Sequence, residues 1–112
     1  MNEEQRVLVA SDMAISIRSF SDISNALGTC LGSGGLILSE DDLSEEFFDL
    51  RSGLAGELFQ KFINYRLRLA IVLPDPEAYG ERFSELSREH ISHSLVRFFR
   101  SKDLAQAWLC GT

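Results

Sequence analysis

Residues 67–73 constrain the fold more than any other part of this 112-residue chain. The last five residues of this run are all apolar, and Pro74 and Pro76 follow directly. A strand with one solvated face would alternate apolar and polar residues, whereas a continuous apolar run is typical of a central strand covered on both faces. Such strands occur mainly in parallel sheets flanked by helices, so this segment predicts an α/β fold.

The rest of the chain alternates strand-like runs with amphipathic stretches. Strands are predicted at 6–11, 36–38 and 95–99, and helices at 19–31, 54–65, 76–90 and 101–109, with a helical turn at 43–48. Ser19, Ser44, Asp75 and Ser101 are the predicted helix caps. We therefore predict one α/β domain over residues 1–112, with a four- to five-stranded, mostly parallel sheet flanked by helices.

Two of the predicted helices have a specific apolar face. The first of these faces consists of Tyr79, Phe83, Leu86 and His90, all assigned to the helix that begins at Pro76. The second, on the last helix, consists of Leu104, Ala105, Trp108 and Leu109. Both sets recur at helical spacing, so the first marks one face of its helix, with His90 half-buried, and we expect the members of the second to face inward.

Charge and composition exclude several classes of function. The chain has 17 acidic and 11 basic residues, a net charge of −6, which argues against a nucleic-acid partner. No apolar run approaches the roughly 20 residues that span a bilayer, and the N-terminus lacks a signal-peptide pattern, so we expect a cytoplasmic protein with no membrane contact.

The potential metal ligands are few and scattered. Cys30 and Cys110 lie far apart in the sequence, and His90 and His93 have no third ligand nearby. We expect free thiols, no metal and no cofactor.

The richest chemistry lies just before the helix that begins near residue 54. Ser52 stands at the helix start, where a phosphate would be favoured by the helix dipole and free amides, so it is a candidate switch. An ordinary capping role explains Ser52 equally well. Asp49, Arg51 and Glu57 offer either an acid–base group or ion pairs that fix the loop. On the exposed side of the helix, Glu57 and Lys61 are spaced for an ion pair, and Asn64 follows one turn later.

Residues 47–72 read FFDLRSGLAGELFQKFINYRLRLAIV. This block resembles a family of small bacterial proteins of unknown function, whose pattern is roughly FFDL-x-x-GLAGE-x-x-QKF-x-NYR-x-(K/R)LAIV. A weaker likeness covers most of the chain, including FFRSKDLAQAWL near the C-terminus. The family often continues with Gly-Asp-Phe, whereas this chain has Leu73-Pro74-Asp75-Pro76.

The arrangement of strand, loop and helix around Ser52 also resembles the SpoIIAA-like, or STAS, domains of anti-sigma-factor antagonists. Those domains have an Asp-Ser-Ser-Gly-Leu loop, and this chain has Asp49-Leu50-Arg51-Ser52-Gly53-Leu54. The resemblance implies that Ser52 matches the serine that is phosphorylated in that family. Arg51 replaces the first serine, and the loop is one residue longer.

These features favour a protein–protein interaction or regulatory module over an enzyme. The predicted partner or ligand face consists of Asp49, Arg51, Glu57, Lys61 and Asn64. The alternative is a small ligand-binding protein or enzyme with a site at the carboxyl ends of the strands near Asp49 and Arg51. A homodimer that hides part of the aromatic surface is a third possibility.

Overall fold

The computed structural model describes residues 6–110. The strands are β1 (Val7–Val9), β2 (Gly35–Ser39), β3 (Leu69–Val72) and β4 (Val96–Phe99). The α-helices are α1 (Phe20–Cys30), α2 (Glu45–Phe48), α3 (Leu54–Asn64), α4 (Glu81–Glu89) and α5 (Lys102–Leu109). Four 3₁₀ turns, η1 (Ala10–Met13), η2 (Glu40–Asp42), η3 (Leu50–Ser52) and η4 (Pro76–Tyr79), complete the order. No helix within residues 6–110 is long and apolar enough to cross a membrane.

The four strands form one sheet in the order β1-β2-β3-β4, and all three pairings are parallel. Leu69 of β3 is in register with Leu36 of β2 on one side and with Val96 of β4 on the other. The predicted mostly parallel sheet with flanking helices is therefore confirmed, with four strands. The strands with continuous apolar sequence, β2 and β3, are the two central ones, as burial on both faces requires.

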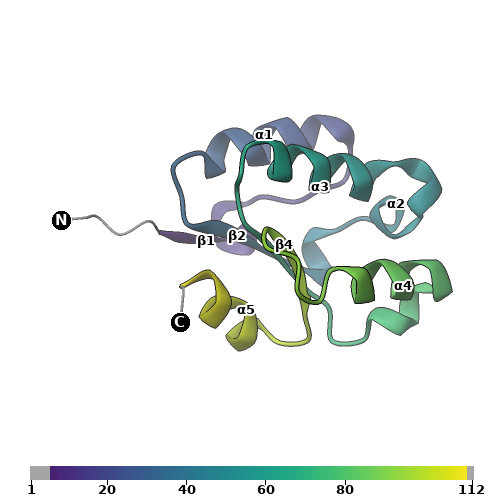
Figure 1. The fold of residues 1–112 in the computed structure, drawn as a ribbon. Coiled ribbons are helices and arrows are strands. Elements are labelled where there is room, and N and C mark those ends of the chain that lie inside the picture. The colour runs from purple at the N-terminus through teal and green to yellow at the C-terminus, as the bar shows by residue number, and fades with distance from the viewer. Residues whose placement is uncertain (1–5, 111–112) are drawn as a thin grey trace.

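The strand order explains why the two faces of the sheet differ. Each connection steps in the same direction, and right-handed crossovers then place every connecting helix on the same face. Figure 1 shows α1 and α3 side by side on one face of the sheet, with α5 on the other. Phe83 of α4 joins the same buried cluster as α1 and α3. One face therefore carries most of the core, and the opposite face is covered by α5.

The side chains of the central strands alternate between these two layers. Leu36 and Leu38 belong to the large cluster, whereas Ile37 belongs to the smaller cluster beneath α5. Trp108 of α5 lies 5.5 Å from Phe99, and the guanidinium groups of Arg68 and Arg97 lie 5.4 and 4.9 Å from its ring. Cation–π contacts of this kind hold the single covering helix against the sheet.

The predicted start of α1 and end of α3 rest on specific caps. Ser19 and Asp22 form a capping box at the start of α1. Helix α3 ends where Leu67 N–H donates to Phe62 O at 2.9 Å, with Arg66 in the left-handed region at φ 55°. That is a Schellman ending with arginine where glycine is usual.

Four local predictions are wrong. Asp75 precedes η4, but its side chain makes no capping hydrogen bond. Tyr79 does not belong to the same helix as Phe83, because Gly80, at φ 103°, separates η4 from α4. Leu104 is 57% exposed, because α5 packs through Ala105 and Leu109 and the neighbouring position is rotated away by about 100°. Ser44 precedes α2, but Phe47 N–H donates to its carbonyl rather than to its hydroxyl.

Candidate functional site

The long connection between β2 and α3 lies at the carboxyl end of the sheet. It begins with η2, where Asp42 is buried and its carboxylate accepts the N–H of Ser39 at 2.8 Å. Helix α2 and turn η3 follow, and Phe47 anchors them to the core through edge-to-face contacts with Phe59 and Phe83. The segment that carries Asp49, Arg51 and Ser52 is therefore fixed to the domain at both of its ends.

Ser52 ties three short elements together. Its hydroxyl donates to Glu46 O in α2 at 2.7 Å and accepts the N–H of Leu54, the first residue of α3, at 3.2 Å. Gly53, at φ 81°, stands between η3 and α3 and takes the N-cap position. The hydroxyl thus satisfies a helix-start N–H, as an ordinary cap does, and also uses its own proton.

The charged residues near Ser52 form two separate pairs. Asp49 accepts the backbone N–H of Arg51 at 3.1 Å and lies 3.6 Å from its guanidinium, with the two side chains 53% and 85% exposed. Glu57 pairs instead with Lys61 at 3.7 Å, one helical turn along α3. The structure therefore does not bring Glu57 together with Asp49 and Arg51. Exposed pairs of this kind hold a loop in place but add little stability.

Asn64 ends the exposed side of α3. Its side-chain oxygen accepts from Gln60 Nε2 at 2.9 Å. Lys61, Gln60 and Asn64 thus line the outer side of this helix, where a partner would find hydrogen-bonding groups that the fold does not need.

An open depression lies beside Asp49 and Arg51. It has a volume of about 420 Å³ and is lined by Phe48, Asp49, Leu50, Arg51, Tyr79, Gly80, Glu81, Arg82 and Phe83. The rings of Phe48 and Tyr79 are stacked with centroids 3.8 Å apart, which gives the depression an aromatic wall. Two guanidinium groups and two carboxylates also line it, so positive and negative charges are present in equal number and neither sign dominates.

The outer surface of α1 and α3 is a second candidate that the sequence prediction covered only on α3. Phe20, Leu31 and Tyr65 are 51%, 55% and 54% exposed. A groove of about 240 Å³ runs between the two helices and is lined by Ile23, Ser24, Leu27, Gly28, Leu31, Lys61 and Tyr65. The sequence did contain a signal for it, since Asp22 is the only charged residue from 19 to 35.

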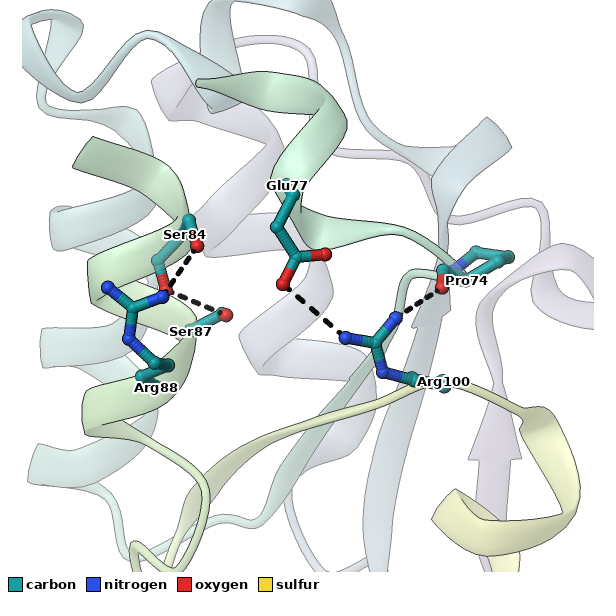
Figure 2. A network of polar contacts seen from close by, with 6 residues as sticks. All are labelled: Pro74, Glu77, Ser84, Ser87, Arg88 and Arg100. Carbon is teal, nitrogen blue, oxygen red and sulfur yellow. Dashed lines mark hydrogen bonds and ion pairs between the residues drawn. The ribbon is translucent and has the colours of Figure 1, made fainter. Parts of the chain in front are cut away.

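Polar networks elsewhere stabilise the fold. Figure 2 shows Arg100 donating to Pro74 O at 2.9 Å and facing Glu77 at 3.5 Å, which ties η4 to the end of β4. In the same view Arg88 donates to Ser84 Oγ at 3.0 Å, and Ser87 donates to Ser84 O. The buried serines of α4 are thus satisfied by the helix itself.

Both histidines contact the backbone through Nδ1, and one of the two cysteines is buried. His93 Nδ1 accepts the N–H groups of Leu95 and Val96, and His90 Nδ1 lies 3.0 Å from Leu86 O. Within residues 6–110, no three His, Cys, Asp or Glu side chains gather as a metal site would require. Cys30 is a buried free thiol, and burial raises its pKa to about 11, which suppresses the reactive thiolate.

The fold and these sites define a small α/β domain with a purely parallel sheet, an open depression between η3 and the start of α4, and a groove between α1 and α3. The chain belongs to the family described as Domain of unknown function (DUF4180), whose profile matches residues 2–109. This agrees with the family resemblance of residues 47–72. No curated protein and no solved structure matches the chain.

Proposed function

We propose that this protein is a non-catalytic, regulatory protein–protein interaction module. Its contact face is the outer surface of α1 and α3, including Glu57, Lys61 and Asn64, continued by Asp49, Arg51 and Ser52. The observation that carries the proposal is the half-exposed state of Phe20, Leu31 and Tyr65 on this surface. Exposed large apolar residues gathered on a surface with few charges are a feature of protein interfaces.

The charged side chains of this face are paired or hydrogen-bonded within the chain. The carboxylate of Asp22 is occupied by the N–H groups of Arg18 and Ser19, at 2.8 and 3.1 Å. Glu57 and Lys61 neutralise each other. A partner that covers the face therefore does not leave a buried charge without its counter-charge or hydrogen bond, which would be strongly unfavourable.

Ser52 is the proposed switch of the module, as the resemblance to anti-sigma-factor antagonists implies. A phosphate on Ser52 has no proton to donate to Glu46 O near neutral pH, and it adds charge next to α2, whose first turn contains Glu45 and Glu46. Phosphorylation would therefore weaken the link between α2 and α3 and change the edge of the contact face.

The proposal is tested by affinity capture from a lysate of cells that express the chain, read by mass spectrometry. Wild type, Ser52→Ala and Ser52→Asp are compared. Both variants lose the hydrogen bond to Glu46, but only Ser52→Asp adds charge. Partners held by wild type and Ser52→Ala and lost by Ser52→Asp support a charge-operated switch. Equal capture by all three removes Ser52 as the switch, and no partner with any of them contradicts the module.

A small ligand-binding protein or enzyme is the second candidate, and the 420 Å³ depression beside Asp49 and Arg51 favours it. That volume is within the range of small-molecule sites, roughly 300–1,000 Å³. A thermal-shift screen of small carboxylates, phosphates and aromatic acids would test it. A ligand that raises the melting temperature of the wild type, but not of Arg51→Ala, would indicate that the ligand binds in the depression.

A further inference from the structure

We propose that His93 makes the connection between α4 and β4 sensitive to mild acid, so that protonation of its imidazole releases the amino end of β4. This inference concerns a conformational switch in the fold and goes beyond the proposed contact face. It follows from the hydrogen bonds of one ring nitrogen, from the charges around the ring, and from the position of β4 at one end of the strand order.

The hydrogen bonds at the start of β4 require a neutral His93. Its Nδ1 accepts the N–H groups of Leu95 and Val96, at 3.0 and 3.1 Å. A ring nitrogen accepts through its lone pair, so a proton on Nδ1 turns this acceptor into a donor. Nδ1 then faces two N–H donors, and both hydrogen bonds are lost. Neutral His93, with its proton on Nε2, is therefore the only protonation state that this arrangement accommodates.

The neighbouring His90 responds to acid differently. The centroid of its ring lies 5.1 Å from that of His93. Its Nδ1 lies 3.0 Å from Leu86 O, and because a carbonyl oxygen only accepts, this nitrogen carries a proton. A second proton on Nε2 keeps that hydrogen bond, and a cation is favourable at the C-terminus of α4, where His90 is the C-cap residue. Acid therefore charges His90 without loss of its hydrogen bond, whereas charging His93 costs two.

The charged groups next to His93 also oppose its protonation. Arg97 donates through Nε to His93 O at 2.6 Å, which places a guanidinium beside the imidazole's own backbone. His90 adds a second positive charge once it is protonated. Phe59 of α3 and Phe98 of β4 pack on His90 and bring no charge. Within residues 6–110 no carboxylate forms an ion pair with either histidine or with Arg97, so the fold offers no counter-charge to a protonated His93.

The segment that acid releases is the start of an edge strand. Strand β4 pairs with β3, and Leu69 N–H donates to Leu95 O at 2.7 Å, so without the His93 bonds this end is held from one side. An imidazole free in water has a pKa of about 6.5 and is about nine-tenths protonated at pH 5.5. The open state thus binds a proton that the closed state excludes. Acidification from pH 7.5 to pH 5.5 therefore raises the equilibrium constant for opening about tenfold.

Amide hydrogen exchange of the full wild-type chain, measured by NMR at pH 7.5 and pH 5.5, tests the inference. Leu104 N–H is the internal reference, because it also donates to a side chain, the hydroxyl of Ser101, which does not titrate in this range. After correction for the intrinsic exchange rates, the protection of Leu95 and Val96 relative to Leu104 should fall about tenfold at pH 5.5. A ratio that is the same at both pH values would overturn the inference.

Two variants separate the roles of the two histidines. His93→Asn keeps a side-chain oxygen that can accept from the backbone but cannot take up a proton. His90→Gln is the matched control, since it removes the neighbouring imidazole and leaves the acceptor bonds of His93 in place. Between pH 7.5 and pH 5.5, the urea midpoint of His93→Asn should fall less than that of the wild type. The midpoint of His90→Gln should fall at least as much as the wild type's, because the favourable charge of His90 on α4 is absent.

The outcomes of the two experiments are distinct. An acid drop in His93→Asn equal to that of the wild type would overturn the role of His93, and a drop abolished by His90→Gln would assign the pH dependence to His90 instead. The exchange measurement uses the unmodified chain, so it decides the question even where a variant fails to fold. Neither experiment involves Ser52 or the groove between α1 and α3, so a negative result here leaves the proposed function standing.

Discussion

His93 is a single residue on which the start of β4 depends. Its Nδ1 accepts two backbone N–H groups, from Leu95 at 3.0 Å and Val96 at 3.1 Å. His93→Ala leaves both donors without their acceptor, so we predict a loss of about 1–3 kcal/mol in the free energy of unfolding. His93→Asn offers a side-chain oxygen at a similar position and should recover much of this loss. Urea unfolding of the three proteins checks the prediction, and an unchanged His93→Ala would contradict it.

Arg66 occupies a backbone conformation that favours glycine. At φ 55° it ends α3, and its side chain is exposed. A non-glycine residue in the left-handed region carries strain of about 1–2 kcal/mol. We therefore predict that Arg66→Gly raises the free energy of unfolding by about 1 kcal/mol, as measured by urea denaturation. A lower stability would mean that the arginine side chain contributes more than its backbone strain costs.

At the level of elements, two glycines are predicted to respond oppositely to alanine. Gly35 begins β2 at φ 136°, and a Cβ there would lie 2.6 Å from Leu109 Cδ2 and 3.0 Å from Arg68 O. Gly35→Ala should therefore move α5 off the sheet and destabilise the fold by about 1–3 kcal/mol. Gly28→Ala, in an open helical position, should stabilise it by about 0.5–1 kcal/mol. Thermal unfolding should show a lower melting temperature for Gly35→Ala and a higher one for Gly28→Ala. Equal shifts in melting temperature would refute the packing of α5 on β2.

The turn η4 should contribute to acid sensitivity through Glu77. Hydrogen bonding from its own backbone N–H lowers the Glu77 pKa most, followed by a bond with Asp75 and the charge of Arg100. A carboxyl group with a lowered pKa in the folded state adds stability above its unfolded pKa and loses it as the pH falls. We predict that the midpoint of urea unfolding falls less between pH 7 and pH 3.5 in Glu77→Gln than in the wild type. An identical acid drop in the variant would exclude Glu77 as a contributor.

Element by element, the sequence predicted what local chemistry determines. The caps at Ser19 and Ser101 and the apolar run of β3 are local signals, and the structure confirms them. Gly80 was missed because a glycine inside a helical pattern does not by itself mark a break. The prediction that Leu104 faces inward was wrong, because helical periodicity identifies an apolar stripe on α5 but not how much of that stripe packs on the sheet.

The candidate site was predictable in part for the same reason. The loop with Asp49, Arg51 and Ser52 is marked by its residue types, and the i,i+4 pair of Glu57 and Lys61 follows from spacing alone. The groove was not predicted, because it depends on α1 lying beside α3. That neighbourhood is a consequence of strand order, which no local pattern in the sequence specifies.

For the whole molecule, strand order is the property that places the contact face. Because the connections all step in one direction, α1 and α3 become neighbours in one layer, and their outer surfaces merge into a single face. A sheet of this order has no point where the strand order reverses, which is where open α/β sheets usually bind small ligands. The overall topology thus favours the helical face over the strand ends as the site of function.

Site-specific photo-crosslinking in cells tests this central claim most directly. A photoreactive amino acid is placed at Ser24 in the groove, at Asn64 on the outer side of α3, or at Glu85 on α4. All three positions are exposed, so chance contacts should be similar. We predict protein adducts from Ser24 and from Asn64, with none above background from Glu85. Adducts confined to Glu85, or absent at all three positions, would contradict the account.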